Sequence, residues 1–121
     1  MTEYNRGDVV LVSFIFTDET GVKRRPAVII SSEAYHAGRD EAIIAAITSR
    51  TDRILVGDHL IADWQHAGLL FPSVVTSIIR TIKREMINKR LGSLSTQDEG
   101  QIDRKLKLAL GLWRGITLHT L

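Results

Sequence analysis

An almost unbroken run of β-branched and aromatic residues near the start of the chain constrains the fold more than any other feature. Residues 9–16 read Val-Val-Leu-Val-Ser-Phe-Ile-Phe, a pattern typical of a strand that is buried on both faces. A polar segment, 17–23, contains Gly21 and leads into a second apolar run at 27–30. Because glycine and polar residues between two such runs favour a turn, we predict a hairpin with a long, charged loop.

Further apolar runs extend the β pattern along the chain. Residues 42–48 and 74–82 predict two more strands. Residues 31–39 predict an irregular crossing with one helical turn, and residues 63–67 predict a second short helical turn before Gly68. Four or more strands that are separated by loops, without long intervening helices, favour an antiparallel barrel.

The last element is predicted to be a helix that packs against the barrel. Thr96 and Glu99 have the spacing of a capping box, in which a hydroxyl and a carboxylate each bond a free backbone N–H. Apolar residues then recur at helical spacing, namely Ile102, Leu106, Ala109, Leu110 and Trp113. Gly115 is predicted to end the helix. The predicted fold class is mainly β (α+β), an antiparallel β-barrel with short helices and a C-terminal helix.

The composition of the chain limits both the cellular compartment that we expect and the kinds of site that the protein can contain. The chain has 121 residues, 44% of them hydrophobic, and no cysteine, so we expect one domain over residues 1–121 without disulfides, thiolate nucleophile or zinc ribbon. Absence of cysteine suits a reducing cytoplasm. No apolar run reaches the roughly 20 residues of a membrane span, and residues 1–6 do not resemble a secretory signal. We therefore expect a cytoplasmic protein.

Two polar residues occupy positions that suit a functional site. The net charge of +2 is too small to indicate nucleic-acid binding by itself, but Lys-Arg-Arg at 23–25 is a local basic cluster. Arg25 precedes Pro26 and is biased to an extended backbone, so we predict a positioned cation at the start of the second strand. Thr48 closes the third strand, where its hydroxyl can donate a hydrogen bond. Taken singly, the cluster could be a solvated loop end and Thr48 an ordinary strand residue.

Three segments together resemble the PemK/MazF family of toxin ribonucleases. They are Arg6-Gly7-Asp8-Val9-Val10-Leu11-Val12, Lys23-Arg24-Arg25-Pro26-Ala27-Val28-Ile29-Ile30 and Ala46-Ile47-Thr48-Ser49, and Pro72-Ser73-Val74-Val75 with the terminal helix extends the likeness over most of the chain. The resemblance implies a small SH3-like barrel, a homodimer, and cleavage of single-stranded RNA, typically messenger RNA, without a metal or other cofactor. It also implies an antitoxin protein whose acidic tail covers the active face and displaces the loop 17–24.

Carried over residue by residue, the resemblance implies that Arg25 and Thr48 form the catalytic pair. If the 2′-hydroxyl of the RNA attacks the adjacent phosphate, a guanidinium can bind two oxygens of the phosphorane as negative charge develops. The threonine hydroxyl can orient a phosphoryl or leaving oxygen. The expected products carry a 2′,3′-cyclic phosphate and a 5′-hydroxyl, and the need for a 2′-hydroxyl excludes DNA as substrate.

Further residues are predicted around this pair. We expect RNA binding, and hence salt-dependent affinity, from Lys23, Arg24, Ser49, Arg50, Arg53 and Arg80, although these arginines are equally compatible with ordinary surface charge. Members of the family often carry an acidic or polar residue shortly before the catalytic arginine, which gives a minor role to the loop residues Asp18, Glu19 and Thr20.

The histidines do not suggest a metal or hydrolase site. We expect surface or partly packed imidazoles without metal-ligand spacing at His36, His59, His66 and His119. Two pairs, Asp58–His59 and Asp63–His66, look like parts of a triad, but no nucleophile motif accompanies them.

Two other functions stay open. One is a non-enzymatic toxin resembling CcdB, which binds and poisons DNA gyrase through a Trp-Gly-Ile ending, because this chain has Trp-Arg-Gly-Ile at 113–116. The other is a catalytically idle barrel that binds RNA or an antitoxin. Gyrase co-purification without RNA cleavage would favour the first, and RNA binding without new RNA ends would favour the second.

Overall fold

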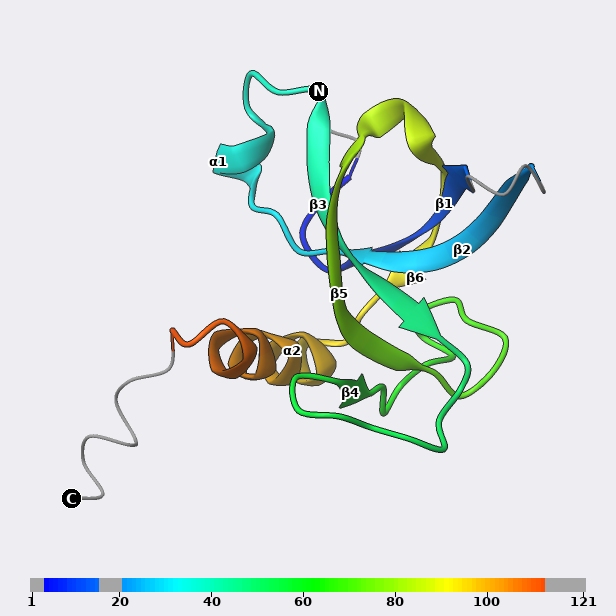
Figure 1. The fold of residues 1–121 in the computed structure, drawn as a ribbon, viewed down its shortest axis with the longest axis vertical. Coiled ribbons are helices and arrows are strands. Elements are labelled where there is room, and N and C mark those ends of the chain that lie inside the picture. Colours follow the sequence, from blue (N-terminus) through cyan, green and yellow to red (C-terminus); the bar gives the residue numbers. More distant parts are fainter. Residues whose placement is uncertain (1–3, 16–20, 113–121) are drawn as a thin grey trace.

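A computed structural model describes residues 4–15 and 21–112 of the chain, which form one antiparallel sheet and a long C-terminal helix (Figure 1). In chain order, the elements are β1 (Asp8–Ile15), β2 (Val22–Ile29), α1 (Glu33–His36), β3 (Glu41–Thr48), β4 (His59–Leu60), β5 (Val74–Lys83), the 3-10 turn η1 (Arg84–Met86), β6 (Ile87–Ser93) and α2 (Thr96–Ala109). Among these residues no helix is long and apolar enough to cross a membrane.

The sheet curls into an open barrel. Its strand order is β4-β5-β3-β2-β1-β6, and η1 carries the chain from the end of β5 directly into β6 at the far edge (Figure 1). Bulges in the pairing of β1 with β6 and of β3 with β5 help the strands to bend. The predicted mainly β, barrel-like fold with a C-terminal helix is confirmed.

Two apolar clusters lie on opposite faces of the sheet. Val9 points into the helix-side cluster beneath α2, with Ala45, Ile61 and Ile102. Val10 points into the barrel cluster, which also contains residues of β2, β3, β5 and β6. Both valines are 0% exposed, which confirms that the first strand is buried on both faces at this end.

β2 begins earlier than predicted. The sequence indicated a start at Arg25, but the ladder with β1 extends from Val9–Val28 to Ile15–Val22, so Arg25 lies within the strand. The polar residues are held in β2 by hydrogen bonding to β1 and not by burial. Pro26, which has no N–H to donate, is tolerated because β2 pairs with β3 only from Ala27 onwards.

The predicted capping box is displaced by one residue. Ser95, not Thr96, caps α2, and its hydroxyl accepts the N–H of Asp98 at 3.1 Å. Glu99 turns away and pairs with Arg6 at 3.4 Å. The helix ends at Ala109, and Gly111 adopts the left-handed conformation just beyond it. The predicted stop, Gly115, lies outside the described residues.

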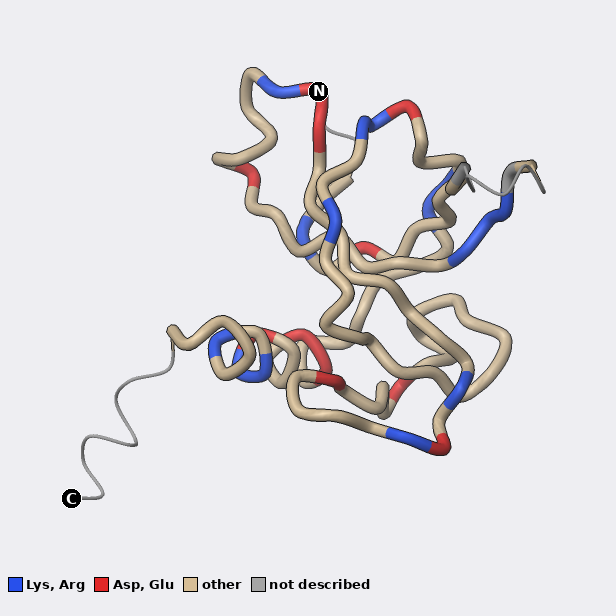
Figure 2. The backbone as a smooth tube through the Cα atoms, in the orientation of Figure 1, with Lys and Arg blue, Asp and Glu red and all other residues tan. Residues whose placement is uncertain are grey.

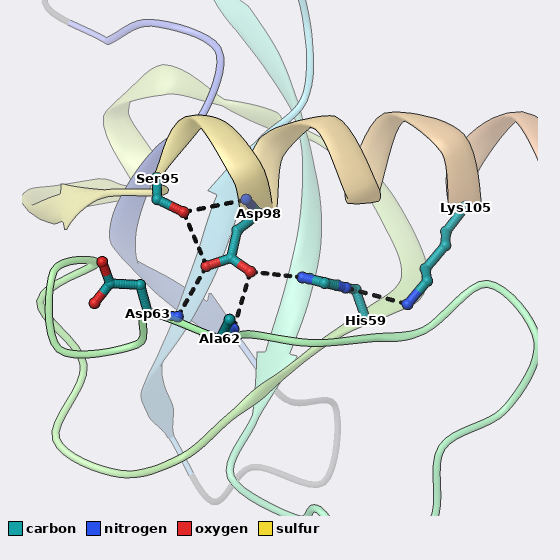
Figure 3. A network of polar contacts seen from close by, with 6 residues as sticks. All are labelled: His59, Ala62, Asp63, Ser95, Asp98 and Lys105. Carbon is teal, nitrogen blue, oxygen red and sulfur yellow. Dashed lines mark hydrogen bonds and ion pairs between the residues drawn. The ribbon is translucent and has the colours of Figure 1, made fainter.

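A buried polar network anchors α2 to the segment after β4 (Figure 3). The carboxylate of Asp98 accepts the His59 Nε2 proton at 2.8 Å, the N–H groups of Ala62 at 2.9 Å and Asp63 at 3.0 Å, and the Ser95 hydroxyl at 3.2 Å. Lys105 lies 3.1 Å from the other ring nitrogen of His59. Since a carboxylate only accepts and an ammonium only donates, these partners fit the tautomer with the proton on Nε2.

The network keeps Asp98 ionised although the residue is 1% exposed. Burial alone would raise the pKa of Asp98, but the hydrogen bonds from Ala62, His59, Asp63 and Ser95 outweigh burial and lower the pKa below its ordinary value. The carboxylate therefore stabilises the fold at neutral pH, and this contribution is lost on acidification.

A second contact ties the loop before β5 to β6 through two glycines. Gly68 has a φ of +82°, and a Cβ there would collide with the carbonyl group of Leu91. A Cβ at Gly92 would likewise collide with the backbone of Ala67. Only glycine allows these two backbones to approach so closely, and this approach sets the position of the segment that follows Gly68.

We expect Gly68→Ala to lower the free energy of unfolding by about 3 kcal/mol, because it combines backbone strain with a collision. Gly38→Ala is the matched control, since Gly38 has a φ of +77° but open space around its Cα, and strain alone costs about 1 kcal/mol. Urea denaturation measures both values, and equal losses in the two variants would contradict the close contact.

We expect Asp98→Asn to cost about 3 kcal/mol at pH 7, because the amide N–H₂ would face N–H donors in a buried site. Since the folded pKa of Asp98 is lowered, its contribution is complete above the unfolded pKa of about 3.9 and falls as the pH drops below that value. The gap in stability between wild type and variant should therefore narrow below about pH 4.

Asp63→Asn is the control for this measurement, because the Asp63 carboxylate points away from Asp98 and only the backbone N–H joins the network (Figure 3). Its stability should remain close to that of wild type. The free energy of unfolding of both variants is measured by denaturation at pH 7 and at acidic pH. An equal loss of stability in the two variants would refute the role of the Asp98 carboxylate.

Candidate active site

The predicted catalytic residues flank a point where two neighbouring strands separate. The ladder between β2 and β3 consists of the pairs Ala27–Ala46, Val28–Ala45 and Ile29–Ile44. Beyond it, β2 stays paired with β1 and β3 stays paired with β5, so the two strands run apart (Figure 1). Continued in the same register, the ladder would set Arg25 opposite Thr48 on one face of the sheet.

A cleft of about 940 Å³ opens at this separation, and both Arg25 and Thr48 line it. Its basic residues are Arg24, Arg25, Arg80 and Lys89, and its hydroxyl residues are Thr48, Ser49 and Ser73. Its apolar residues include Phe14, Ile47, Leu69, Leu70, Phe71 and Ile78. No carboxylate of the described residues lines the cleft, so its electrostatic character favours an anion.

Arg25 is positioned by the β1–β2 hairpin. It pairs with Val12, which is fully buried, and strand alternation places it on the same face as buried Ala27. Its side chain is exposed, and Nη1 donates a long hydrogen bond of 3.4 Å to the carbonyl of Arg24. The backbone of Arg25 is thus fixed by a ladder while its guanidinium faces solvent in the cleft.

Thr48 is oriented by the chain that follows it. Its Oγ1 accepts the N–H of Arg50 at 3.1 Å, which closes a tight turn after β3. This bond uses the hydroxyl oxygen as acceptor and does not use its proton. The half-buried hydroxyl can therefore donate to a bound oxygen from a fixed position.

Arg80 is held by an aromatic ring. Its guanidinium lies 5.1 Å from the centroid of the Phe14 ring, a cation–π contact that limits the movement of the side chain. The pairing of Arg80 with Ile44 places it on the barrel-cluster face of β5. A second guanidinium is thus fixed in the wall of the cleft that contains Arg25.

The structure brings together only part of the predicted RNA-binding set. Arg24, Ser49 and Arg80 line the cleft with the catalytic pair, whereas Lys23, Arg50 and Arg53 do not. Figure 2 shows the basic stretch of β2 well separated from the basic residues in the loop after β3. The predicted loop residues Asp18, Glu19 and Thr20 lie outside the described residues.

Arg50 has a different partner. It pairs with Asp52 at 3.3 Å on the exposed turn after β3. The hydrogen bond from Arg50 is the largest of the influences that lower the pKa of Asp52 below its ordinary value.

The sequence did not predict two residues of the cleft, Lys89 and Phe71. No strand was predicted at 87–93, and Phe71 lies in an apolar loop without a recognisable motif.

The expectation of surface or partly packed histidines is wrong for His36 and His59, which are both buried. Nε2 of His36 lies 2.6 Å from the hydroxyl of Ser31. Burial lowers the pKa of His36, the charge of Arg84 lowers it further, and Glu33 opposes the shift. The imidazole is therefore neutral at pH 7.

The triad-like pairs do not form a site. His59 bonds to Asp98 and not to Asp58, while the Asp58 carboxylate accepts backbone N–H groups from residues 55 and 77. His66 is exposed, and His119 lies outside the described residues. Within the described part of the chain, no three His, Asp or Glu side chains are grouped as metal ligands.

Comparison with solved structures shows which proteins share this fold. The Mycobacterium tuberculosis toxin MazF-mt6 is 24% identical, with a TM-score of 0.71 over 88% of this chain and 99% of that one. A mycobacterial endoribonuclease solved with its cognate antitoxin is 22% identical, with a TM-score of 0.71 over 91% and 98%. A MazE–MazF structure from Deinococcus radiodurans gives 20% identity and a TM-score of 0.76 over 93% and 100%.

The family itself is shown by the sequence. The model of the PemK-like, MazF-like toxins of type II toxin–antitoxin systems matches residues 5–110, a range that includes the whole cleft and almost all of the described chain. The resemblance carried by the segments around Gly7, Arg25 and Thr48 is thereby confirmed. This chain belongs to the PemK-like, MazF-like family of type II toxins.

Proposed function

We propose that this toxin is an endoribonuclease that cuts single-stranded RNA without a metal and leaves a 2′,3′-cyclic phosphate and a 5′-hydroxyl. The observation that carries the proposal is the shared cleft, which holds the exposed guanidinium of Arg25 and the oriented hydroxyl of Thr48 and which no carboxylate of the described residues lines. Proteins of the same fold that are named endoribonucleases support the assignment.

The proposed reaction uses the RNA's own nucleophile. The 2′-hydroxyl oxygen bonds to the adjacent phosphorus, the bond from phosphorus to the 5′-oxygen breaks, and the proton lost by the 2′-hydroxyl is balanced by the proton gained by the 5′-oxygen. Arg25 binds two phosphoryl oxygens as they gain negative charge. Thr48 donates to a third oxygen and orients the phosphate for attack in line with the leaving group.

The remaining cations of the cleft suit the neighbouring phosphates. Arg24 precedes Arg25 on β2, Arg80 is held on β5 by Phe14, and Lys89 lies on β6 opposite Leu11. A strand of RNA that crosses the cleft would meet these cations on three different strands. Each phosphate contact releases counterions, so binding should weaken as salt is added.

Arg25→Ala should reduce cleavage of a mixed RNA ladder in excess EDTA by about a hundredfold or more, because a charged donor to the transition state is lost. Arg25→Lys should restore only part of the rate, since an ammonium lacks the two-pronged donor geometry. Thr48→Val should also lose most activity while Thr48→Ser retains it. Fragment rates from gel electrophoresis, with mass spectrometry of the fragment ends, measure each effect.

Arg53→Ala is the matched control, because Arg53 is exposed and lies outside the cleft, and its activity should be that of wild type. Thermal melting confirms that each variant is folded. Cleavage that needs added magnesium, or that survives Arg25→Ala in a folded protein, would contradict the proposal.

We also propose a homodimer neutralised by an antitoxin. The structure of a mycobacterial relative with its cognate antitoxin supports such a partner, and an acidic segment would suit the basic cleft. An exposed apolar surface supports the dimer. It comprises two exposed segments, which are Ile54, Leu55 and Val56 before Gly57, and Leu108, Leu110 and Leu112 at the end of α2. The two segments approach each other where a Cβ at Gly57 would lie 3.1 Å from the Cβ of Ala109.

Val56→Asp should shift the oligomeric state towards monomer, because it places a charge on a residue that is 77% exposed in the isolated chain and covered in the proposed dimer. Native mass spectrometry at micromolar concentration measures the dimer fraction. Glu85→Lys, an exposed charge change at η1, is the control and should leave that fraction unaltered. Wild-type protein that is entirely monomeric would contradict the dimer.

The gyrase-binding alternative depends on Trp113 and the three residues after it, which lie outside the described residues. No observation in the cleft favours it, and we do not propose it.

A further inference from the structure

One lip of the cleft carries large apolar side chains that no residue in the described part of the chain covers. Leu70 is 81% exposed and Phe71 is 62% exposed, yet both line the same cleft as Arg25 and Thr48. Exposing a phenylalanine ring to water is unfavourable, and the neighbouring Leu69 shows that this segment is able to bury a side chain. The exposed ring is therefore a surface on which a bound ligand would be stabilised by covering it.

The backbone behind Phe71 is firmly held. The hydroxyl of Ser73 donates to the carbonyl of Phe71 at 2.8 Å, and the N–H of Ile61 donates to the carbonyl of Ser73 at 3.0 Å. On the other side, Gly68 is locked against the backbone of β6. The ring is thus presented from a fixed segment and loses little freedom when a ligand binds.

The surroundings of the ring match single-stranded nucleic acid better than protein. The cleft combines four cations with exposed apolar side chains, and no described carboxylate lines it. Proteins that bind single strands use this combination, with cations for the phosphates and an aromatic face on which a base stacks. An apolar protein segment packed against a lip of two exposed residues would bury little area and would bring no negative charge to the cations.

We propose that Phe71, with Leu70 beside it, is the platform on which an unpaired base of the RNA stacks while the adjoining phosphate lies between Arg25 and Thr48. This inference rests on the proposed ribonuclease function and adds a positioning residue to it. The platform acts on binding and register of the RNA, and Phe71 takes no part in bond making or breaking.

The test measures RNA binding apart from cleavage. The probe is a fluorescein-labelled pool of short random-sequence 2′-O-methyl oligoribonucleotides, which lack the free 2′-hydroxyl needed for the reaction. By fluorescence anisotropy, Phe71→Ala should weaken binding about tenfold, and Phe71→Trp should preserve it. Leu60→Ala is the matched control, because Leu60 is 47% exposed and lies outside the cleft, and it should bind like wild type.

The salt dependence of RNA affinity distinguishes a loss of base stacking from a loss of phosphate contacts. Phe71→Ala should keep the wild-type slope of log affinity against log salt, whereas Arg24→Ala should reduce that slope by about one. With cleavable RNA, Phe71→Ala should raise KM and leave kcat nearly unchanged. Melting temperatures show that each variant is folded, and native mass spectrometry shows that its oligomeric state is that of wild type.

Each outcome decides the proposal. Wild-type binding by folded Phe71→Ala, or loss of binding in folded Phe71→Trp, would overturn it while leaving the ribonuclease assignment intact. A change of oligomeric state in Phe71→Ala would overturn it in favour of an interface between copies of the chain. Wild-type protein that neither binds the pool nor cuts RNA would overturn both proposals. Loss of cleavage in Arg25→Ala, together with weakened binding but a retained kcat in Phe71→Ala, supports both.

Discussion

The short ladder between β2 and β3 determines where the proposed chemistry of this toxin can occur. Its pairs end at Ala27 and Ala46, and beyond them each strand follows its other neighbour. This separation opens the cleft, and the register of the ladder places Arg25 and Thr48 on the same face of the sheet, where both line the cleft. A slip of one residue in this pairing would turn one of the two side chains to the opposite face.

The separation also explains why the cleft has a mixed lining. Phe14 belongs to the barrel cluster, whereas Ile47 and Leu69 belong to the helix-side cluster, and all three reach the cleft. Because the strands part there, the cavity opens between the two halves of the core. The helix-side cluster keeps its shape through the Asp98 network, which fixes α2 and the segment after β4 on one side of the sheet (Figure 3).

Local sequence patterns predict the buried parts of this fold and miss the parts that depend on pairing. The apolar runs locate the cores of β1, β3 and β5. Lys23 and Arg24, however, belong to β2 through backbone pairing with β1 and not through an apolar pattern, so periodicity does not reveal where the strand starts. β6 reads Ile-Asn-Lys-Arg-Leu-Gly-Ser, without alternation of apolar and polar residues. Its strand, and with it the position of Lys89, was therefore not predicted. The cap was misplaced because Ser95–Asp98 and Thr96–Glu99 offer the same spacing, and only the buried partners of Asp98 select the first.

Under the proposed function, the cleft separates two requirements of a nuclease that selects its cutting sites. Arg25 and Thr48 belong to strands, whose hydrogen-bonded ladders fix the backbone positions of both residues. Leu70 and Phe71 belong to a loop, where a substitution alters the shape of the lip without disturbing either core cluster. In the proposed mechanism, the strand residues therefore decide whether a phosphodiester is cut. The loop residues influence which phosphodiester of the RNA is placed at Arg25 and Thr48, because stacking depends on the identity of the base whereas the phosphate contacts do not.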